Sequence, residues 1–243
     1  MRHIIENVAS YAEFADAVTG ILKTFTKYQI PVIKSVSRQE SYLFKFLLTH
    51  NFILSNARKH HVPAEGRRIY EAFEVEFQLD GQYWLQYGLY LVALGQLEPA
   101  LHVLLRSIQA YPDNLFAVHA HADLQLRIAK QRSTYDSTTR NLIGEAVEAL
   151  LKQDARRELV LDQYPIVTLA NGHIGALVKH GRLAEAKKAA AQYFERLKEL
   201  DRQISNQLVN RTKERLLRFV TLNQWAEHFL DAGQGRAKER KWK

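Results

Sequence analysis

The segment that most constrains the fold is residues 81–114, GQYWLQYGLYLVALGQLEPALHVLLRSIQAYPDN. Its apolar residues recur at helical spacing on both sides of Gly95, a residue type that favours a turn between helices. Gly88 and Ala100 are small where two helices must approach closely, and Pro112 follows the second helix as a terminator. We therefore predict two antiparallel helices. Apolar packing between them is expected from Trp84, Leu91, Leu101, Leu104 and Leu105.

The same 34 residues resemble a tetratricopeptide repeat. The resemblance rests on Trp84, Gly88, Gly95, Ala100, Leu104 and Pro112, which stand at positions that this family fills with such residues. It implies stacked neighbouring hairpins, because one hairpin cannot bury its apolar face alone. It also implies a scaffold that holds partner proteins.

The composition favours an all-α protein. Runs rich in Ala, Leu, Glu, Lys, Arg and Gln recur along the 243 residues, and strand-like alternation is scarce. The chain has no cysteine, which excludes disulfides, thiolate catalysis and sulfur-ligated zinc sites and fits a reducing compartment. It shows neither an apolar window long enough to span a membrane nor the unbroken apolar core of a signal peptide. We expect a soluble cytoplasmic protein.

Residues 1–79 predict an N-terminal helical segment. Apolar residues at helical spacing indicate one helix over about residues 6–27 and another over about residues 64–78. Between them, Ser37-Arg38-Gln39-Glu40 has the pattern of a capping box, from which a helix is expected to run to about residue 54. Asp80-Gly81 then separates this segment from the repeat region.

Residues 80–232 predict about three helix hairpins and a capping helix. Ala122 stands 34 residues after Gly88, and a polar loop over residues 131–137 follows, after which we expect Ser137 to cap a helix. A further hairpin covers about residues 165–200, with Pro165 in its first turn and a turn at 180–182. A helix over about residues 202–231 is expected to cover the end of the array, and residues 233–243 form a basic flexible tail. The residues expected near the apolar face of this last helix are Ile204, Leu208, Leu216, Phe219, Leu222, Trp225 and Phe229.

A second resemblance covers about residues 65–130. The phrases WLQYG and AYPDN resemble the region that follows the NTPase module in large bacterial signal-transducing ATPases of the STAND class, many of which act in antiphage defence. The Gly-rich phosphate loop that such an NTPase requires is not found anywhere in the chain. The resemblance therefore implies the sensor or scaffold portion, without ATP hydrolysis.

No motif predicts catalysis or metal binding. On a helix, His119 and Asp123 share a face whereas His121 points elsewhere, so at most two metal ligands come from this cluster. No serine lies in a Gly-x-Ser-x-Gly context, and the spacing of Glu145 and Glu148 is that of a solvated helix face. We expect a non-catalytic protein without a metal or cofactor. An unrecognised enzyme is the weakest alternative.

The resemblance to the repeat family places a partner-binding groove on the first helix of each hairpin. Some members clamp a terminal carboxylate with Lys and Asn, and this chain matches them only through Asn171 and Lys179. A groove that mixes Leu with Gln, His and Arg suits a helix or an extended peptide of mixed character. The expected groove residues are Gln82, Gln86, His119, Asp123, Arg127, Asn171 and Lys179.

The formal net charge of +8 indicates an acidic partner. The densest positive region consists of Arg211, Lys213, Arg215, Arg218, Arg236, Lys238, Arg240 and Lys241. The leading hypothesis is a protein-interaction scaffold or sensor. The alternative is a nucleic-acid-binding module that uses this basic C-terminal region.

Overall fold

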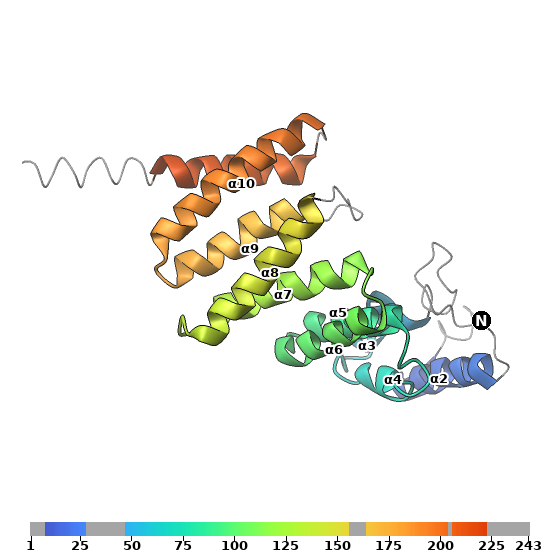
Figure 1. Cartoon of the computed structure of the whole chain (residues 1–243). Coiled ribbons are helices and arrows are strands. Elements are labelled where there is room, and N and C mark those ends of the chain that lie inside the picture. The colour runs from blue at the N-terminus through green and yellow to red at the C-terminus, as the bar shows by residue number, and fades with distance from the viewer. Residues whose placement is uncertain (1–7, 28–46, 156–163, 204–205, 223–243) are drawn as a thin grey trace, which may run out of the picture. The chain divides into compact units, whose positions relative to one another are not determined.

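The computed structural model describes residues 8–27, 47–155, 164–203 and 206–222, and the fold is all-α (Figure 1). No strand occurs within these ranges. The contacts divide the chain into two compact units, residues 1–124 and 125–243, which are considered separately below. None of the described helices is both long and apolar enough to cross a membrane.

The predicted hairpin is confirmed in the first unit, as α5 (Gly81–Ala93) and α6 (Leu97–Ala110). Gly95 takes a φ of 76° in the turn, a conformation that favours glycine. At Gly88 the two helices lie so close that an added Cβ would come within 2.6 Å of Leu104 Cγ. Asp80 caps α5, because its Oδ1 accepts hydrogen bonds from the backbone N–H groups of Gln82 and Tyr83 at 2.9 and 3.0 Å. Burial raises the pKa of Asp80 to about 6.

The predicted packing of Trp84 is confirmed. Its side chain is only 3% exposed, its indole N–H donates to the carbonyl of Gln78 at 2.9 Å, and the Arg106 guanidinium lies 4.8 Å from the ring centroid. The prediction for Leu105 is wrong, because that side chain is 42% exposed. Leu104 and Ala100 already fill the side of α6 that faces α5.

The first unit also contains α2 (Tyr11–Lys27), α3 (His50–Lys59) and α4 (Arg67–Glu71). The described helix α2 begins later than expected, because Ser10 Oγ accepts from the N–H of Glu13 while the Glu13 carboxylate accepts from the N–H of Ala9, as in a capping box. The expected capping box at Ser37–Glu40 lies outside the described residues.

The helix expected over residues 64–78 is shorter than predicted. Only Arg67–Glu71 is helical, and turns follow over residues 72–79. Two phenylalanines and a valine lower the helix propensity of this stretch, and the like charges of Glu71 and Glu74, three residues apart, oppose a further helical turn.

Buried tyrosines join this segment to α5. Tyr70, Tyr83 and Tyr90 are fully buried, and the ring of Tyr70 stacks on that of Tyr87 with centroids 4.8 Å apart. Each of the three buried hydroxyls donates to a backbone carbonyl: Tyr70 to Leu48 at 2.8 Å, Tyr83 to Tyr70 at 2.5 Å and Tyr90 to Pro63. Burial raises the pKa of Tyr70 well above its ordinary value, so this core stays neutral.

Helix α7 (Leu115–Gln131) begins in the first unit, and its residues 125–131 belong to the second. The second unit continues with α8 (Ser137–Ala155), α9 (Pro165–Lys179), α10 (Leu183–Gln203) and a helix over residues 207–222. Pro165 at the start of α9 and the turn at Gly181, with a φ of 69°, are confirmed. Leu126 of α7 packs against Gly172 of α9, and Lys130 against Gly175, so these two helices run in the same direction.

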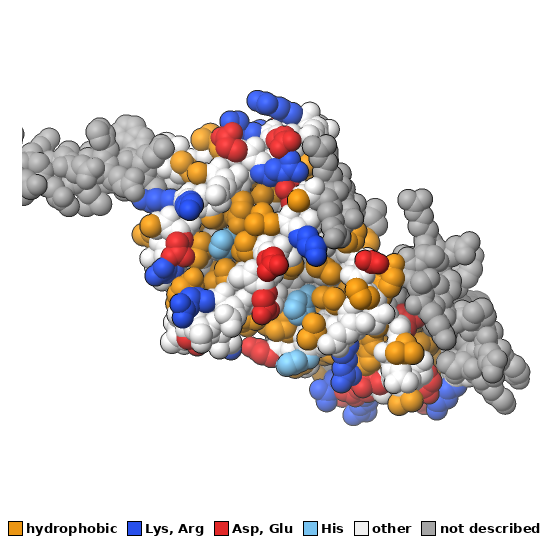
Figure 2. Space-filling model, in the orientation of Figure 1, with side chains coloured by type: hydrophobic (Ala, Val, Ile, Leu, Met, Phe, Trp, Pro, Cys, Tyr) orange, Lys and Arg blue, Asp and Glu red, His pale blue; other side chains and the backbone are white. Residues whose placement is uncertain are grey.

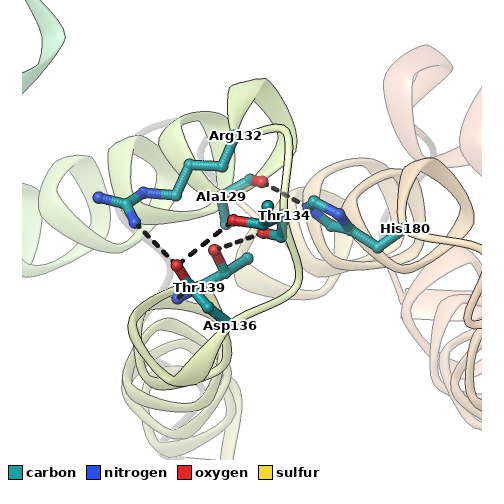
Figure 3. Close-up of polar contacts among 6 residues, drawn as sticks. All are labelled: Ala129, Arg132, Thr134, Asp136, Thr139 and His180. Carbon is teal, nitrogen blue, oxygen red and sulfur yellow. Dashed lines mark hydrogen bonds and ion pairs between the residues drawn. The ribbon is translucent and has the colours of Figure 1, made fainter.

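The polar loop between α7 and α8 is held by its own side chains (Figure 3). Asp136, not the expected Ser137, caps α8, because Asp136 Oδ1 accepts from the N–H of Thr139 at 2.8 Å. Arg132 pairs with the same carboxylate at 3.8 Å. His180, at the end of α9, lies 2.8 Å from the carbonyl oxygen of Ala129 through its Nε2, which joins α9 to α7 (Figure 3).

The last described helix begins later than predicted. Helix α10 runs to Gln203, and Asn206 caps the next helix by accepting from the N–H of Leu208 at 2.8 Å. The buried side of this helix consists of Val209, Thr212 and Leu216, whereas Leu208 is 47% and Leu222 is 69% exposed. The expected apolar face was therefore wrong for these two leucines. Trp225 and Phe229 lie outside the described residues.

A matched pair of glycines tests the close approach of α5 and α6. Gly88→Ala should destabilise the protein by about 1–3 kcal/mol, because the new methyl group would overlap Leu104. Gly144→Ala in α8 should stabilise it by about 0.5–1 kcal/mol, since nothing lies within 4 Å of an added Cβ there. Urea unfolding of the two variants measures both effects, and equal effects would contradict the packing described.

Trp84→Ala should lower the free energy of unfolding by about 3–5 kcal/mol, because it empties a buried site between the helices. Val75→Ala is the control, since Val75 is 77% exposed, and it should change stability by less than about 0.5 kcal/mol. An unchanged thermal midpoint for Trp84→Ala would show that this indole does not support the hairpin.

Candidate partner-binding surfaces

In the first unit, the expected groove residues lie on α5 and α7. The Gln86 side-chain oxygen accepts from the backbone N–H of His50 at 3.1 Å and lies 2.8 Å from His50 Nδ1, so Gln86 joins α5 to α3. Gln82 and Asp123 are partly exposed, whereas His119 is buried, with only 6% of its surface exposed. In this part of the expected groove, Gln86 is therefore engaged in contacts within the unit, and His119 is buried in it.

In the second unit, the structure brings together two residues that were expected on different surfaces. Arg215, from the basic region, donates to the side-chain oxygen of Asn171 and, at 3.3 Å, to the carbonyl of Ala170. Asn206, just before the same helix, donates to the hydroxyl of Tyr164 at 3.2 Å. The helix over residues 207–222 therefore lies along α9 and runs in the same direction.

Lys130 is a surface residue that the sequence analysis missed. An added Cβ on Gly175 would lie 3.5 Å from Lys130 Nζ, so the lysine side chain crosses α9 at a position that has no side chain. Asn171, Gly175 and Lys179 follow at four-residue intervals and share one face of α9. This face therefore has Lys130 of α7 on one side and Arg215 of the last helix on the other.

We define the basic surface as the positive residues of these three parallel helices apart from Lys213. Residues 125–131 and α9 contain no acidic residue, and residues 207–222 contain only Glu214. Arg127, Lys179, Arg211 and Arg218 are exposed and have no ion-pair partner among the residues described. The members of the basic surface are Arg127, Lys130, Lys179, Arg211, Arg215 and Arg218.

The remaining expected basic residues form two groups, one engaged within the unit and one outside the described residues. Lys213 forms an ion pair with Asp201 of α10 and is therefore engaged within the unit. Arg236, Lys238, Arg240 and Lys241 lie outside the described residues.

Helices α8 and α10, by contrast, mix charges of both signs. Arg196 binds Asp154 at 2.7 Å and Glu199 at 2.5 Å, and Lys198 binds Glu195 at 2.9 Å. These ion pairs neutralise part of the charge of α8 and α10 locally. The parts of the three helices that form the basic surface contain one acidic residue, Glu214, so the local field there is positive.

A groove of about 550 Å³ lies where α8, α9 and α10 meet. Its apolar lining comes from all three helices: Val147, Leu151, Ile166, Leu177 and Ala189. Figure 2 shows hydrophobic side chains gathered over these helices, with charged side chains around them. We call it the α8–α10 groove.

The polar pair in this groove consists of His173 of α9 and Tyr193 of α10. His173 Nδ1 lies 2.8 Å from the Tyr193 hydroxyl oxygen. Burial lowers the pKa of His173 to about 4 and raises the pKa of Tyr193 to about 12. Both side chains are therefore neutral at neutral pH, and neither is placed beside a nucleophile or a metal cluster in the described ranges.

The groove and the basic surface lie on opposite faces of α9. Ile166, His173 and Leu177 recur at a helical spacing of seven and four residues, and Asn171 and Gly175 stand about half a helical turn away from them. One helix thus separates an apolar site from a charged one.

Comparison of the chain with protein-family models, with curated proteins and with solved structures found no match.

The pKa of His173 predicts a pH dependence of stability. Between pH 6.5 and about 4 the unfolded chain binds a proton at this residue before the folded chain does, so stability falls as the pH falls. His173→Gln should remove up to about 3 kcal/mol of this loss. Chemical unfolding at several pH values provides the measurement.

Tyr193→Phe is the control, because it leaves a buried, titratable His173 in place. This variant should therefore keep most of the dependence of the unfolding free energy on pH. If the unfolding free energy of His173→Gln depended on pH as strongly as that of the wild type, this imidazole would not be held neutral by the fold.

Proposed function

We propose that the chain is a tetratricopeptide-like, non-catalytic scaffold that binds an acidic segment of a partner protein on the basic surface. The observation that supports this proposal is the uneven distribution of charge in the second unit. Exposed cations without ion-pair partners gather on three parallel helices that contain almost no acidic residue there, whereas the neighbouring α8 and α10 carry charges of both signs, several of them in ion pairs. An acidic segment along α9 would relieve the mutual repulsion of these cations.

The chemistry between the cations favours a peptide over a nucleic acid. Asn171 offers an amide, Val178 is 39% exposed, and the Lys130 side chain lies over Gly175. Residues 125–131 and α9 contain no Phe, Tyr or Trp, and the one imidazole of α9, His173, lines the α8–α10 groove, so these two helices offer no ring on this face on which a base could stack. Nucleic-acid binding is the second candidate, supported by Arg211, Arg215 and Arg218 at helical spacing.

We also propose that the scaffold serves a bacterial signalling or antiphage-defence system, as the sensor portion of a STAND-class ATPase or as a separate relative. The support is the sequence resemblance over about residues 65–130. A genomic neighbourhood that lacks both an NTPase and defence genes in several related genomes would contradict this assignment.

Charge reversal tests the basic surface. Arg127→Glu combined with Lys179→Glu should weaken the binding of an oligoglutamate peptide by about tenfold or more, because two cations become anions beside the peptide. Fluorescence anisotropy at several salt concentrations measures the affinity. Thermal stability should change by less than about 0.5 kcal/mol per substitution, since both side chains are exposed.

Arg140→Glu combined with Lys152→Glu on α8 is the matched control. It changes the net charge equally but lies outside the basic surface, so it should leave most of the affinity intact. Equal losses in the two double variants would mean that only the net charge matters. Tighter binding of a random single-stranded oligonucleotide than of oligoglutamate at physiological salt would favour the second candidate.

A further inference from the structure

We infer that the α8–α10 groove is a second docking site, which takes an amphipathic helix of a partner protein with an acidic residue on its flank. The site is independent of the basic surface, because it lies on the opposite face of α9.

The length of the groove matches a short helix. Its lining on α9 extends from Ile166 to Leu177, and its lining on α8 extends from Val147 to Asp154. At 1.5 Å per residue the stretch on α9 is about 16 Å long, or three helical turns. The groove is open to solvent, which suits a helix that buries one apolar face more than it suits a small molecule, most of whose surface is buried when bound.

The walls of the groove have the spacing and bulk that receive a helix. On α8, Val147 and Leu151 stand four residues apart, and Leu151 is 43% exposed. Gly144, one turn earlier on the same stripe, has nothing within 4 Å of an added Cβ, so another backbone can approach closely there. On α10, the small side chain of Ala189 lines the opposite wall beside Gln192.

The charges at the rim determine the chemistry of the flank. Asp154 is paired with Arg196, and Glu185 is paired with Arg182. Lys188 also lines the groove, and it is exposed and has no ion-pair partner among the described residues. Among the charged residues that line the groove, Lys188 is therefore the one left without an ion-pair partner, and an acidic residue on the docking helix would complement it.

The floor of the α8–α10 groove disfavours a charged side chain on the docking helix. The His173–Tyr193 pair is neutral and internally hydrogen-bonded, so a charged side chain pointing into the groove would gain no ion pair there and would lose its hydration. The docking helix is therefore apolar toward the floor and acidic only at its edge.

Selection from a displayed peptide library tests this inference. The library holds helical peptides of three to four turns with a leucine stripe and randomised flanking positions, and the bait is the full chain. Wild-type protein should enrich peptides with Asp or Glu at one flank. Lys188→Glu should instead enrich peptides with Lys or Arg at that flank, and should bind the wild-type peptides about tenfold more weakly.

Two groove variants and one control locate the binding. Leu151→Glu places a charge in the groove, and Gln192→Trp fills it, so each should weaken the enriched peptides by about tenfold or more. Leu105→Glu is the control, because Leu105 lies on α6 and is 42% exposed, close to the 43% of Leu151. Circular dichroism verifies that each variant remains helical.

Three outcomes would overturn the inference. The first is no enrichment on the wild-type protein. The second is enrichment without an acidic preference at the flank. The third is equal weakening by Leu151→Glu and Leu105→Glu. Loss of oligoglutamate binding, by contrast, bears on the basic surface alone, so the two proposals fail separately.

Discussion

The close contact between a helix glycine and a leucine of a neighbouring helix is the constraint on which the rest of the structure depends. In the first unit Gly88 faces Leu104, and in the second Gly172 faces Leu126, where an added Cβ would lie 2.8 Å from the leucine Cδ1. Because packed interiors tolerate little overlap, these contacts fix how near the helices lie. That distance in turn determines which side chains are left at the surface.

In the second unit this packing gives α9 two faces of different chemistry. Gly172 admits Leu126, and Gly175 lets Lys130 cross the helix, so α7 lies against one side of α9. Helices α8 and α10 cover the other side only in part, and the groove remains between them. Ile166, His173 and Leu177 of α9 therefore line the groove, whereas Asn171 and Lys179 lie on the face of the basic surface. A single amphipathic pattern in the sequence thus supports two surfaces of different chemistry.

The sequence predicted those features that depend on local residue chemistry. The turns at Gly95 and Gly181 were predicted because glycine adopts a positive φ without strain. The burial of Trp84 was predicted correctly because a large apolar side chain on a hairpin helix gains the most free energy when it leaves water.

The failures depend on neighbours that a periodic pattern does not reveal. Leu105 has apolar character and helical spacing, but Leu104 already occupies the position against α5. Asp136 displaced Ser137 as the cap of α8 because the loop turns one residue earlier. The buried side of residues 207–222 also differs from the predicted one. Val209 and Leu216 are buried on this helix, which lies along α9, whereas Leu208 is exposed. Lys130 was missed because its role depends on Gly175, 45 residues later in the chain.

The net charge of the whole chain is positive, but the distribution of its ion pairs says more about where a partner could bind. A surface ion pair contributes little to stability, so paired residues on α8 and α10 are no strong evidence of function. Like charges that remain unpaired on parallel helices repel one another, and the fold gains nothing from them. Arg211 and Arg218 lie one turn on either side of Arg215, which already bonds to α9, and no acidic residue of α9 neutralises them. This repulsion, which the fold itself does not offset, is the physical basis on which we propose a partner, and its sign is the reason that we propose an acidic one.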